Sequence, residues 1–471
     1  MKFLIKSINW ITFFGLLPLI LINYSYAIVH NTNYYNELYS KLTEQTQDHI
    51  DYLSNIGFAE RAKGIKVNLF KLETDNLTKV DLSSFQCQME IPQEVIDFDC
   101  NLKNTLITTD PTINYNKPED LQKILDIRLY PVLRNLIKQH KTELFLGTKQ
   151  EMAHYYDSKR FKILFEFIIP SSAIYYLAES STGEFHIIMA GLVSKENSIA
   201  QLLTLKLAGI KIETIKIIGE TKHFIEIVKK DISTLINKLP LLNNGNNVLI
   251  IAGCGLENTV SNIINQKFEG CLEETKIFKG DIISLLYHPL AKPLNDIHGF
   301  ISLHLNYGEI VEEIIKLLLK NCKCKYVFSG GAGGYISSNG CKQKPSIGDR
   351  IKITQSMNEL GETVALQQNL DLQSIHDTTT STMHLHIASI FLETYEWLKI
   401  AQQHGNSVDV ETFYIIRAIQ NYNLNNPDNL IKADCGYFVS DYVGEKPLRE
   451  YSNVYKKYPD ILSVFLKKCY S

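Results

Sequence analysis

Arginine is missing from a long central part of this 471-residue sequence: none lies between Arg160 and Arg350. Lysine and arginine together number 48 against 51 aspartates and glutamates, and no segment concentrates basic residues. A nucleic-acid partner therefore has no electrostatic support, and we expect none. Internal repeats and low-complexity tracts are also missing. The 45% share of hydrophobic residues is enough to bury a core, which excludes a disordered or fibrous chain.

Long apolar runs are missing beyond residues 1–27. That segment has Lys2 and Lys6, an apolar stretch over Ile11–Ile22, and a small-x-Ala ending at Ala27. Its twelve apolar residues are fewer than the roughly 20 that span a bilayer as a helix. The pattern predicts a secretory signal peptide and an exported protein, periplasmic or secreted. An uncleaved N-terminal anchor is the alternative.

Cysteine occurs nine times, an odd number, so at least one thiol stays free or pairs between chains. Export permits disulfides in the rest. Cys322 and Cys324 form a Cys-x-Cys pair between an expected helix and strand, without a second such pair. We interpret this pair as packing or a local disulfide rather than zinc, and we expect no metal or other cofactor.

The sequence pattern of residues 28–240 predicts an additional α+β region of unknown role. Apolar runs suited to strands cover 161–169, 185–191 and 211–219, and helical patterns cover 34–53, 118–140, 197–207 and 222–239. The segment Leu241–Asn247 is rich in Asn and Gly, which favour turns, and is the best candidate for a linker.

Residues 247–471 predict an α/β domain. Continuous apolar strands alternate with helical segments at 258–266, 308–319 and 393–404. This alternation predicts a mostly parallel central sheet flanked by helices. Ligands bind such sheets at the carboxyl ends of the strands.

Four segments at strand ends carry residues suited to ligand binding: Gly253–Glu257, Ser329–Gly334, Val408–Glu411 and Phe438–Asp441. The first two are rich in glycine, which lets a ligand approach the backbone closely. The third would place two acids on one strand face, and the fourth ends in Ser-Asp. Each also has a structural interpretation: a tight turn, a surface strand with ion pairs, or a helix N-cap.

Together these segments resemble the nucleoside phosphorylase and nucleosidase superfamily, over about 247–471. VFSGGAGGYISS followed by PSIGDRIKI is similar to the family's strand, small-residue loop and Gly-Asp strand. Val408–Glu411 resembles the nucleosidase pattern V-E-M-E, and Val439-Ser440-Asp441 its terminal S-D. IIAGCGLE is similar to the G-S-G-L turn of trimeric purine phosphorylases, and Phe391–Thr394 to their F-E-T segment.

The resemblance implies an enzyme that cleaves the N-glycosidic bond of a purine nucleoside. Asp441 would act as the acid at the leaving base, and Glu411 would bind the ribose hydroxyls. Val410 would pack against the sugar and Phe391 would stack on the base. Residues of the small-residue loop would form the floor: Ser329, Gly330, Gly331, Ala332 and Gly333. Gly253 and Gly255 would bring backbone N–H groups to an anion or a ribose, and we expect a homo-oligomer.

Three departures from the family favour water over phosphate as the nucleophile. No arginine is available between the first turn and the small-residue loop. Cys254 replaces a phosphate-binding serine, and Glu411 would repel phosphate. His288, His298 and His304 could still bind an anion, Glu257 is a candidate for orienting water, and His384 with His386 could ligate a metal. A purine nucleoside phosphorylase and a catalytically inactive nucleoside- or base-binding protein remain alternatives.

Overall fold

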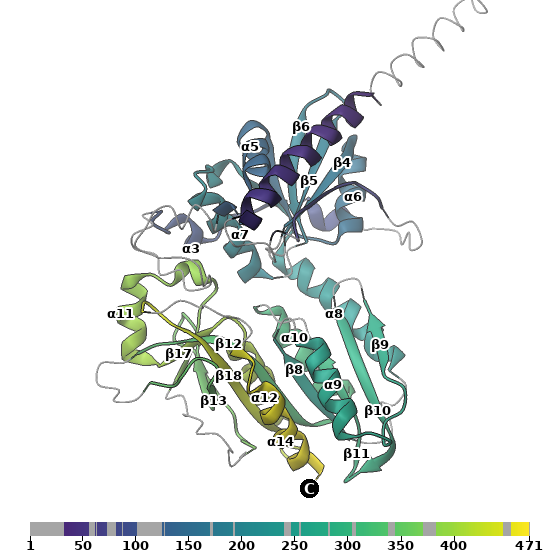
Figure 1. Cartoon of the computed structure of the whole chain (residues 1–471), viewed down its shortest axis with the longest axis vertical. Helices are drawn as coiled ribbons and strands as arrows, with labels where there is room; N and C mark the ends of the chain where they lie inside the picture. The colour runs from purple at the N-terminus through teal and green to yellow at the C-terminus, as the bar shows by residue number, and fades with distance from the viewer. Residues whose placement is uncertain are drawn as a thin grey trace, which may run out of the picture.

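The computed structural model describes residues 33–55, 62, 64–72, 82–86, 88–100, 125–126, 128–169, 173–191, 194–239, 246–253, 256–280, 283–303, 308–337, 344–370, 383–445 and 454–470. The expected signal peptide and most of the expected linker lie outside these residues. Within them, no helix is long and apolar enough to cross a membrane. Figure 1 shows two domains, the N-terminal one above the C-terminal one, with helix α8 at the junction.

The N-terminal domain is built on a seven-stranded sheet. Its strand order is β1 (Lys66–Leu69), β4 (Phe161–Ile168), β5 (Ile174–Ser180), β6 (Phe185–Ala190), β3 (Lys141–Phe145), β7 (Lys216–Ile218) and β2 (Gln88–Met89). Residues 33–55 are helical, and the other helices are η2 (Leu82–Phe85), α3 (Gln93–Ile96), α5 (Pro131–Gln139), α6 (Lys149–Ser158), α7 (Lys195–Leu207) and η4 (Ile212–Thr214). Strands β6, β3 and β7 are parallel and the other pairs are antiparallel. This mixture agrees with the α+β region expected from the sequence.

The C-terminal domain contains an eleven-stranded sheet. Its main path is β15 (Thr363–Ala365), β14 (Gln355–Met357), β16 (His384–His386), β17 (Ser407–Asp409), β12 (Cys324–Tyr335), β8 (Asn246–Ala252), β11 (Ile297–Leu303), β10 (Ser284–Leu294) and β9 (Lys276–Lys279). Strand β18 (Lys432–Tyr442) pairs with β12 and with β13 (Arg350–Ile353). The central strands β11, β8, β12 and β18 are parallel, as the sequence predicts, while antiparallel strands extend the sheet at its edges.

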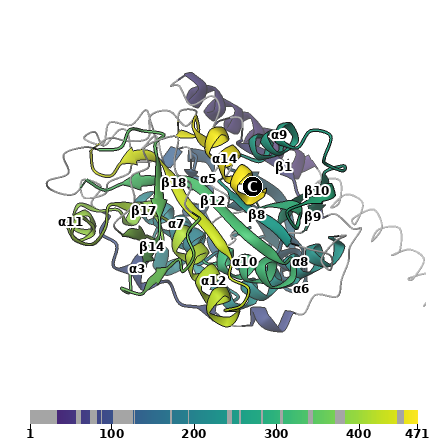
Figure 2. The same ribbon diagram turned by 90° about the horizontal axis from the view of Figure 1, so that it is seen from below.

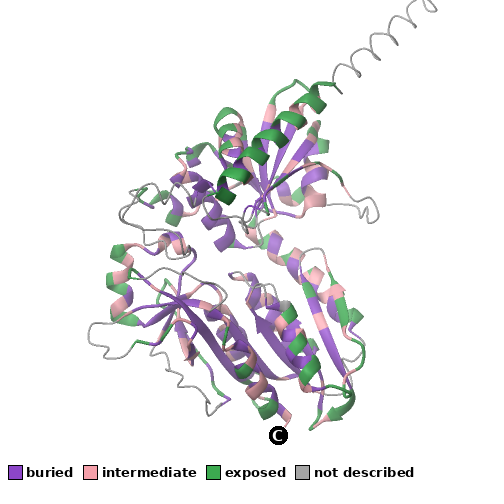
Figure 3. Ribbon diagram, in the orientation of Figure 1, coloured by how far each residue is buried: buried purple, intermediate pink, exposed green. Residues whose placement is uncertain are grey.

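Helices cover both faces of this sheet, which explains the continuous apolar sequence of its central strand. The helices are α8 (Thr221–Lys238), α9 (Glu257–Lys267), α10 (Ile310–Asn321), η5 (Ile390–Leu392), α11 (Tyr395–His404), α12 (Thr412–Asn425) and α14 (Tyr458–Tyr470). Leu249 and Ile251 of β8 share a buried cluster with α8, α10 and α12, and the alternate residues Val248 and Ile250 share another with α9 and α14. Figure 2 shows the two groups of helices on opposite sides of the strands, and Figure 3 shows the strands buried between them.

Helix α8 belongs to the core of the C-terminal domain. Phe224, Val228 and Leu235 lie in the same hydrophobic cluster as α10 and the central strands. The structural boundary between the domains therefore falls before Thr221, not at the expected linker after residue 240.

The six described cysteines have free thiols: Cys100, Cys271, Cys322, Cys324, Cys435 and Cys469. Cys322 and Cys324 are both buried in the core of the C-terminal domain. The pair therefore packs in the core and forms no local disulfide.

Candidate functional site

The small residues after Ser329 lie on a strand, not in the expected loop. All of them belong to β12, which continues to Tyr335 because β18 pairs with it from Tyr326 onward. On its other side β12 pairs with β8 up to Gly330 and with β17 only at Gly334 and Tyr335. The sheet is therefore interrupted on one side of β12, over Gly331–Gly333.

The carboxyl ends of two strands approach this interruption from opposite directions. Strand β8 is parallel to β12 and ends at Ala252, whereas β17 is antiparallel to β12 and ends at Asp409. A Cβ atom built on Gly331 would have no heavy atom within 4 Å, so the protein is open there. The family resemblance predicts that a bound ligand lies against these residues.

Gly253 borders the opening on the β8 side. Its N–H donates to the Gly330 carbonyl (3.0 Å), and a Cβ atom on Gly253 would lie 3.4 Å from the Gly331 Cα and 2.8 Å from the Tyr455 hydroxyl. A side chain at this position would therefore be obstructed. Cys254 and Gly255, two other residues of the expected turn, lie outside the described part of the chain.

Asp441 lies on the opposite side of β12. It pairs with Gly334 near the end of β18, and its Oδ2 lies 3.3 Å from the position of a Cβ atom on Gly334. The Ser440 hydroxyl oxygen lies 2.9 Å from the Gly333 carbonyl oxygen and 2.5 Å from Asp441 Oδ1, so its one hydrogen can be donated to either. Asp441 is 5% exposed. Because Asp441 lies on a strand, the alternative that Ser-Asp caps a helix is wrong.

The segment Val408–Glu411 is a junction between a strand and a helix, not a strand throughout. Strand β17 ends at Asp409, and Glu411 is the N-cap position of α12. The two acids therefore do not share one strand face, as the sequence alternation predicted.

Asp409 fixes this junction. Its Oδ1 accepts hydrogen bonds from the N–H groups of Glu411 (3.0 Å) and Thr412 (2.9 Å), which satisfies backbone donors at the start of the helix. His384 Nε2 lies 3.0 Å from the same oxygen, and His384 Nδ1 is hydrogen-bonded to Ser407 (2.8 Å). Burial alone would raise the pKa of Asp409, but His384 and the hydrogen bonds from Thr412 lower it. Asp409 is therefore a charged cap that positions Glu411.

The pKa of Glu411 is shifted in the opposite direction from that of Asp409. Burial raises its pKa well above the ordinary value, and the negative charges of Asp409 and Glu196 raise it further. Val410, between the two acids, is 8% exposed and lies where the chain leaves β17. Glu411 therefore keeps its proton to higher pH than an ordinary glutamate, beside the charged Asp409.

Glu196 comes from the N-terminal domain and was not predicted as a site residue. It lies on α7, is 1% exposed, and accepts hydrogen bonds from the Tyr414 hydroxyl (2.7 Å) and the Glu309 N–H (3.0 Å). The carboxylate occupies the space where Gly308, with a φ of 68°, has no side chain. Nothing in the sequence signals this contact, because a glutamate in the first turn of a helix is usually solvated.

Phe391 does not have the predicted role of a base-stacking ring. It is 0% exposed and packs in the hydrophobic cluster of the N-terminal domain, with the Arg128 guanidinium 4.9 Å from the ring centroid. The ring therefore has no exposed face for a ligand in this structure.

The expected anion-binding histidines do not gather at the site within the described residues. His288 is buried in the middle of β10 and hydrogen-bonded to Thr275 (2.9 Å), and His298 lies near the amino end of β8. His304 follows the end of β11 but lies outside the described residues, as does the side chain of Glu257. His386 contacts Glu359 (2.7 Å), and the described residues contain no group of His, Cys, Asp or Glu side chains able to hold a metal ion.

No family model and no curated protein matches the sequence. Solved structures are similar to it, however. Three of them are a 5′-methylthioadenosine/S-adenosylhomocysteine nucleosidase from Campylobacter jejuni, a futalosine hydrolase from Helicobacter pylori, and a purine nucleoside phosphorylase from Toxoplasma gondii in complex with immucillin-H. They are a nucleosidase, a hydrolase and a phosphorylase.

The likeness to these structures spans about half of this chain. In the same order, the identities are 11%, 9% and 11%, and the TM-scores are 0.36, 0.35 and 0.36. Each match covers 48% of this chain and 99%, 97% and 91% of the other chain. Identities this low concern the fold alone, so the chemistry of the site has to be argued from its own residues.

Proposed function

We propose that the C-terminal domain cleaves the N-glycosidic bond of a purine nucleoside, with water as the nucleophile. One observation carries the proposal: strand β18, which carries Asp441, and strand β17, which leads to Glu411, flank β12 on opposite sides where Gly331 faces open space. A planar base and its sugar fit over such a segment, and the two acids then face different parts of the ligand.

The chemistry follows from these two positions. When the bond between C1′ and the base nitrogen breaks, its electron pair leaves with the base and positive charge develops on the sugar. Asp441 gives a proton to the base, and water adds to C1′ and loses a proton. The negative charges of Asp409 and Glu196 favour the cationic sugar.

The charge distribution also supports water over phosphate. The Arg350 guanidinium is buried and lies 2.6 Å from Asp434, and Arg417 is paired with Glu312. Both arginines are therefore engaged in ion pairs. A phosphate ion in the opening would meet the carboxylates around Glu411 with neither guanidinium to bind it.

Base release measured with and without inorganic phosphate tests the proposal. We expect free base and free sugar at a rate that does not depend on phosphate. Release that rises in proportion to phosphate and yields ribose 1-phosphate would establish a phosphorylase instead. A protein that binds purine nucleosides but releases no base would establish a binding protein.

Two variants test the roles of the acids. Asp441→Asn should lower kcat by about 10²–10⁴ with the ligand still bound, because an amide cannot deliver the proton. Glu411→Gln should lower kcat/KM for the nucleoside while free base still binds. Asp428→Asn is the control, since Asp428 is exposed in the connection between α12 and β18. Folded variants with normal turnover would remove both acids from the mechanism.

We also propose that the protein is exported. Lys2, Lys6 and the apolar stretch Ile11–Ile22 support cleavage after Ala27. N-terminal sequencing of the mature protein should begin at Ile28. A mature chain that begins at Met1 would contradict the proposal.

A further inference from the structure

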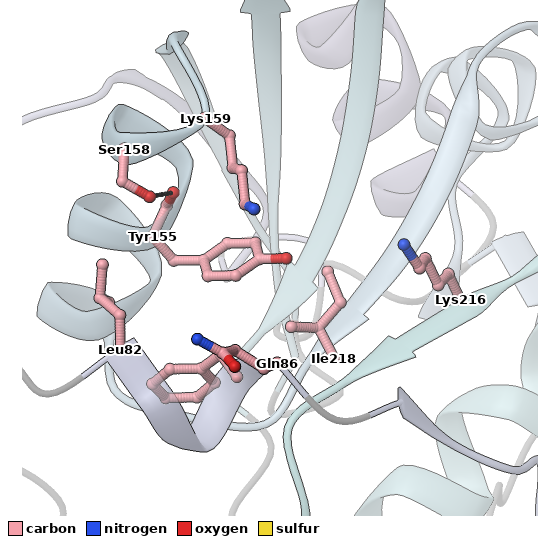
Figure 4. A pocket seen from close by; sticks show the side chains of 8 residues that line it. Leu82, Gln86, Tyr155, Ser158, Lys159, Lys216 and Ile218 are labelled. Atoms are coloured by element: carbon pink, nitrogen blue, oxygen red, sulfur yellow. Dashed lines mark hydrogen bonds between the residues drawn. The ribbon is translucent and has the colours of Figure 1, made fainter.

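The N-terminal domain contains a cavity of about 380 Å³ that the proposed reaction does not use. It lies between η2, the end of α6 and strand β7, and all of its lining residues belong to the N-terminal domain (Figure 4). Its volume is in the range of about 300–1,000 Å³ that is typical of sites for small ligands.

The inner part of the cavity is apolar and fixed. Phe85 and Ile218 are each 2% exposed. Phe85 stacks on Phe145 with ring centroids 4.6 Å apart. The Phe85 and Tyr155 rings pack edge to face, with centroids 6.1 Å apart. These contacts hold the aromatic walls in place before any ligand binds. A flat ring is therefore the shape that this part of the cavity accepts best.

The outer part of the cavity is positively charged. Lys159 and Lys216 line it, no acidic residue does, and neither lysine has an ion-pair partner within the described ranges. Figure 4 shows the ammonium groups of the two lysines on either side of the Tyr155 hydroxyl in this view. Burial raises the pKa of Tyr155, as does the charge of Glu143, so this hydroxyl keeps its proton and can donate.

We propose that this cavity binds a small aromatic anion: a planar ring that carries a phosphate or carboxylate group. The ring lies against Tyr155, Phe85 and Ile218, and the anionic group lies between Lys159 and Lys216. The Gln86 amide, at the edge of the cavity in Figure 4, can hydrogen-bond to a polar atom of the ring. A phosphate and a carboxylate offer the same oxygen acceptors here, and binding measurements separate them.

Isothermal titration of the full-length protein with phenyl phosphate, benzoate and inorganic phosphate tests the proposal. These probes contain no nucleoside, so binding at the C-terminal site does not interfere. We expect phenyl phosphate or benzoate, or both, to bind at least tenfold more tightly than inorganic phosphate. The tighter of the two identifies the anionic group.

Three variants locate the binding. The double variant Lys159→Ser/Lys216→Ser and the single variant Tyr155→Leu should each weaken binding at least tenfold. Lys211→Ser removes an exposed lysine just before η4 that does not line the cavity, and this variant should bind the probes normally. Asp441→Asn should also bind normally, which separates this site from the proposed catalytic one.

Two results would overturn the proposal. One is the absence of phenyl phosphate and benzoate binding to the wild-type protein at millimolar concentration. The other is binding that the double lysine variant does not change while circular dichroism shows that this variant is folded.

Discussion

Replacing Glu309 by glutamine should stabilise the protein above about pH 4.5, and the full effect should be reached above about pH 7. Glu309 precedes α10, where the N-terminal end of a helix normally favours a negative charge. Burial, together with the charge of the nearby Glu196 carboxylate, raises its pKa from 4.5 to about 7. The folded protein therefore holds a proton that the unfolded chain releases between these two pH values.

The sign and size of the effect follow by linkage. Because the folded state binds more protons in this window, stability falls as the pH rises from 4.5 to about 7. That rise in pKa corresponds to roughly 3 kcal/mol, at about 1.4 kcal/mol per pH unit. Glu309→Gln removes the penalty. We expect equal stabilities at low pH and a variant that is more stable by up to roughly 3 kcal/mol at about pH 8.

Glu313, on the same helix, is a control of opposite sign. Burial alone would raise its pKa, but the hydrogen bond and charge of Lys316, together with Lys229, lower it. The ionised Glu313 carboxylate therefore stabilises the folded state above the pKa that it has in the unfolded chain. This stabilisation is lost as the pH falls through the lower pKa of the folded state. Glu313→Gln should therefore be less stable than the wild type at about pH 8. Urea unfolding followed by the fluorescence of Trp397 measures both variants, and a shift of both in the same direction would refute the reasoning.

Two further predictions concern the strand at the site and its support. Gly331→Ala should leave the melting temperature unchanged but raise KM, because its Cβ enters open space. Gly333→Ala should lower the free energy of unfolding by about 1–3 kcal/mol, because its Cβ would lie 2.6 Å from the Tyr437 ring. Melting curves and steady-state kinetics test this, and a larger loss of stability in Gly331→Ala than in Gly333→Ala would contradict it. Arg350→Met should cost about 3–5 kcal/mol by leaving the Asp434 carboxylate buried without its guanidinium. Arg350→Met/Asp434→Leu should recover much of that loss in urea unfolding, and a double variant less stable than the single one would contradict the assignment.

The central architecture could be predicted from the sequence because it depends on local patterns. Strand β8 has two buried faces, so its residues form a continuous apolar run, and the helices on either side show helical spacing. The full length of β12 could not be predicted in this way. Glycine and alanine have little preference for strands, and it is pairing with β18 that keeps Gly330–Gly334 extended.

The residues of the candidate site stay predictions, and their geometry could not be read from the sequence. Asp441 lies at the end of β18 and the glycines lie on the neighbouring β12. The alternation at Val408–Glu411 has the period of a strand, but Asp409 binds the first N–H groups of α12 and starts a helix instead. Phe391 is an apolar residue that follows a strand, a position from which it could either contact a ligand or pack in a core. In the structure it packs in the hydrophobic core of the N-terminal domain.

The positions of the two proposed acids depend on different parts of the molecule. Asp441 is held by β12 through Ser440 and the ladder to β18, all within the C-terminal domain. Glu411 is held by a segment that the N-terminal domain fixes on both sides. Before it, Phe391 is packed in the core of that domain, and one turn after it, Tyr414 donates to Glu196. The separation between the two proposed acids therefore depends on how the two domains pack, which gives the N-terminal domain a direct part in the geometry of the proposed site.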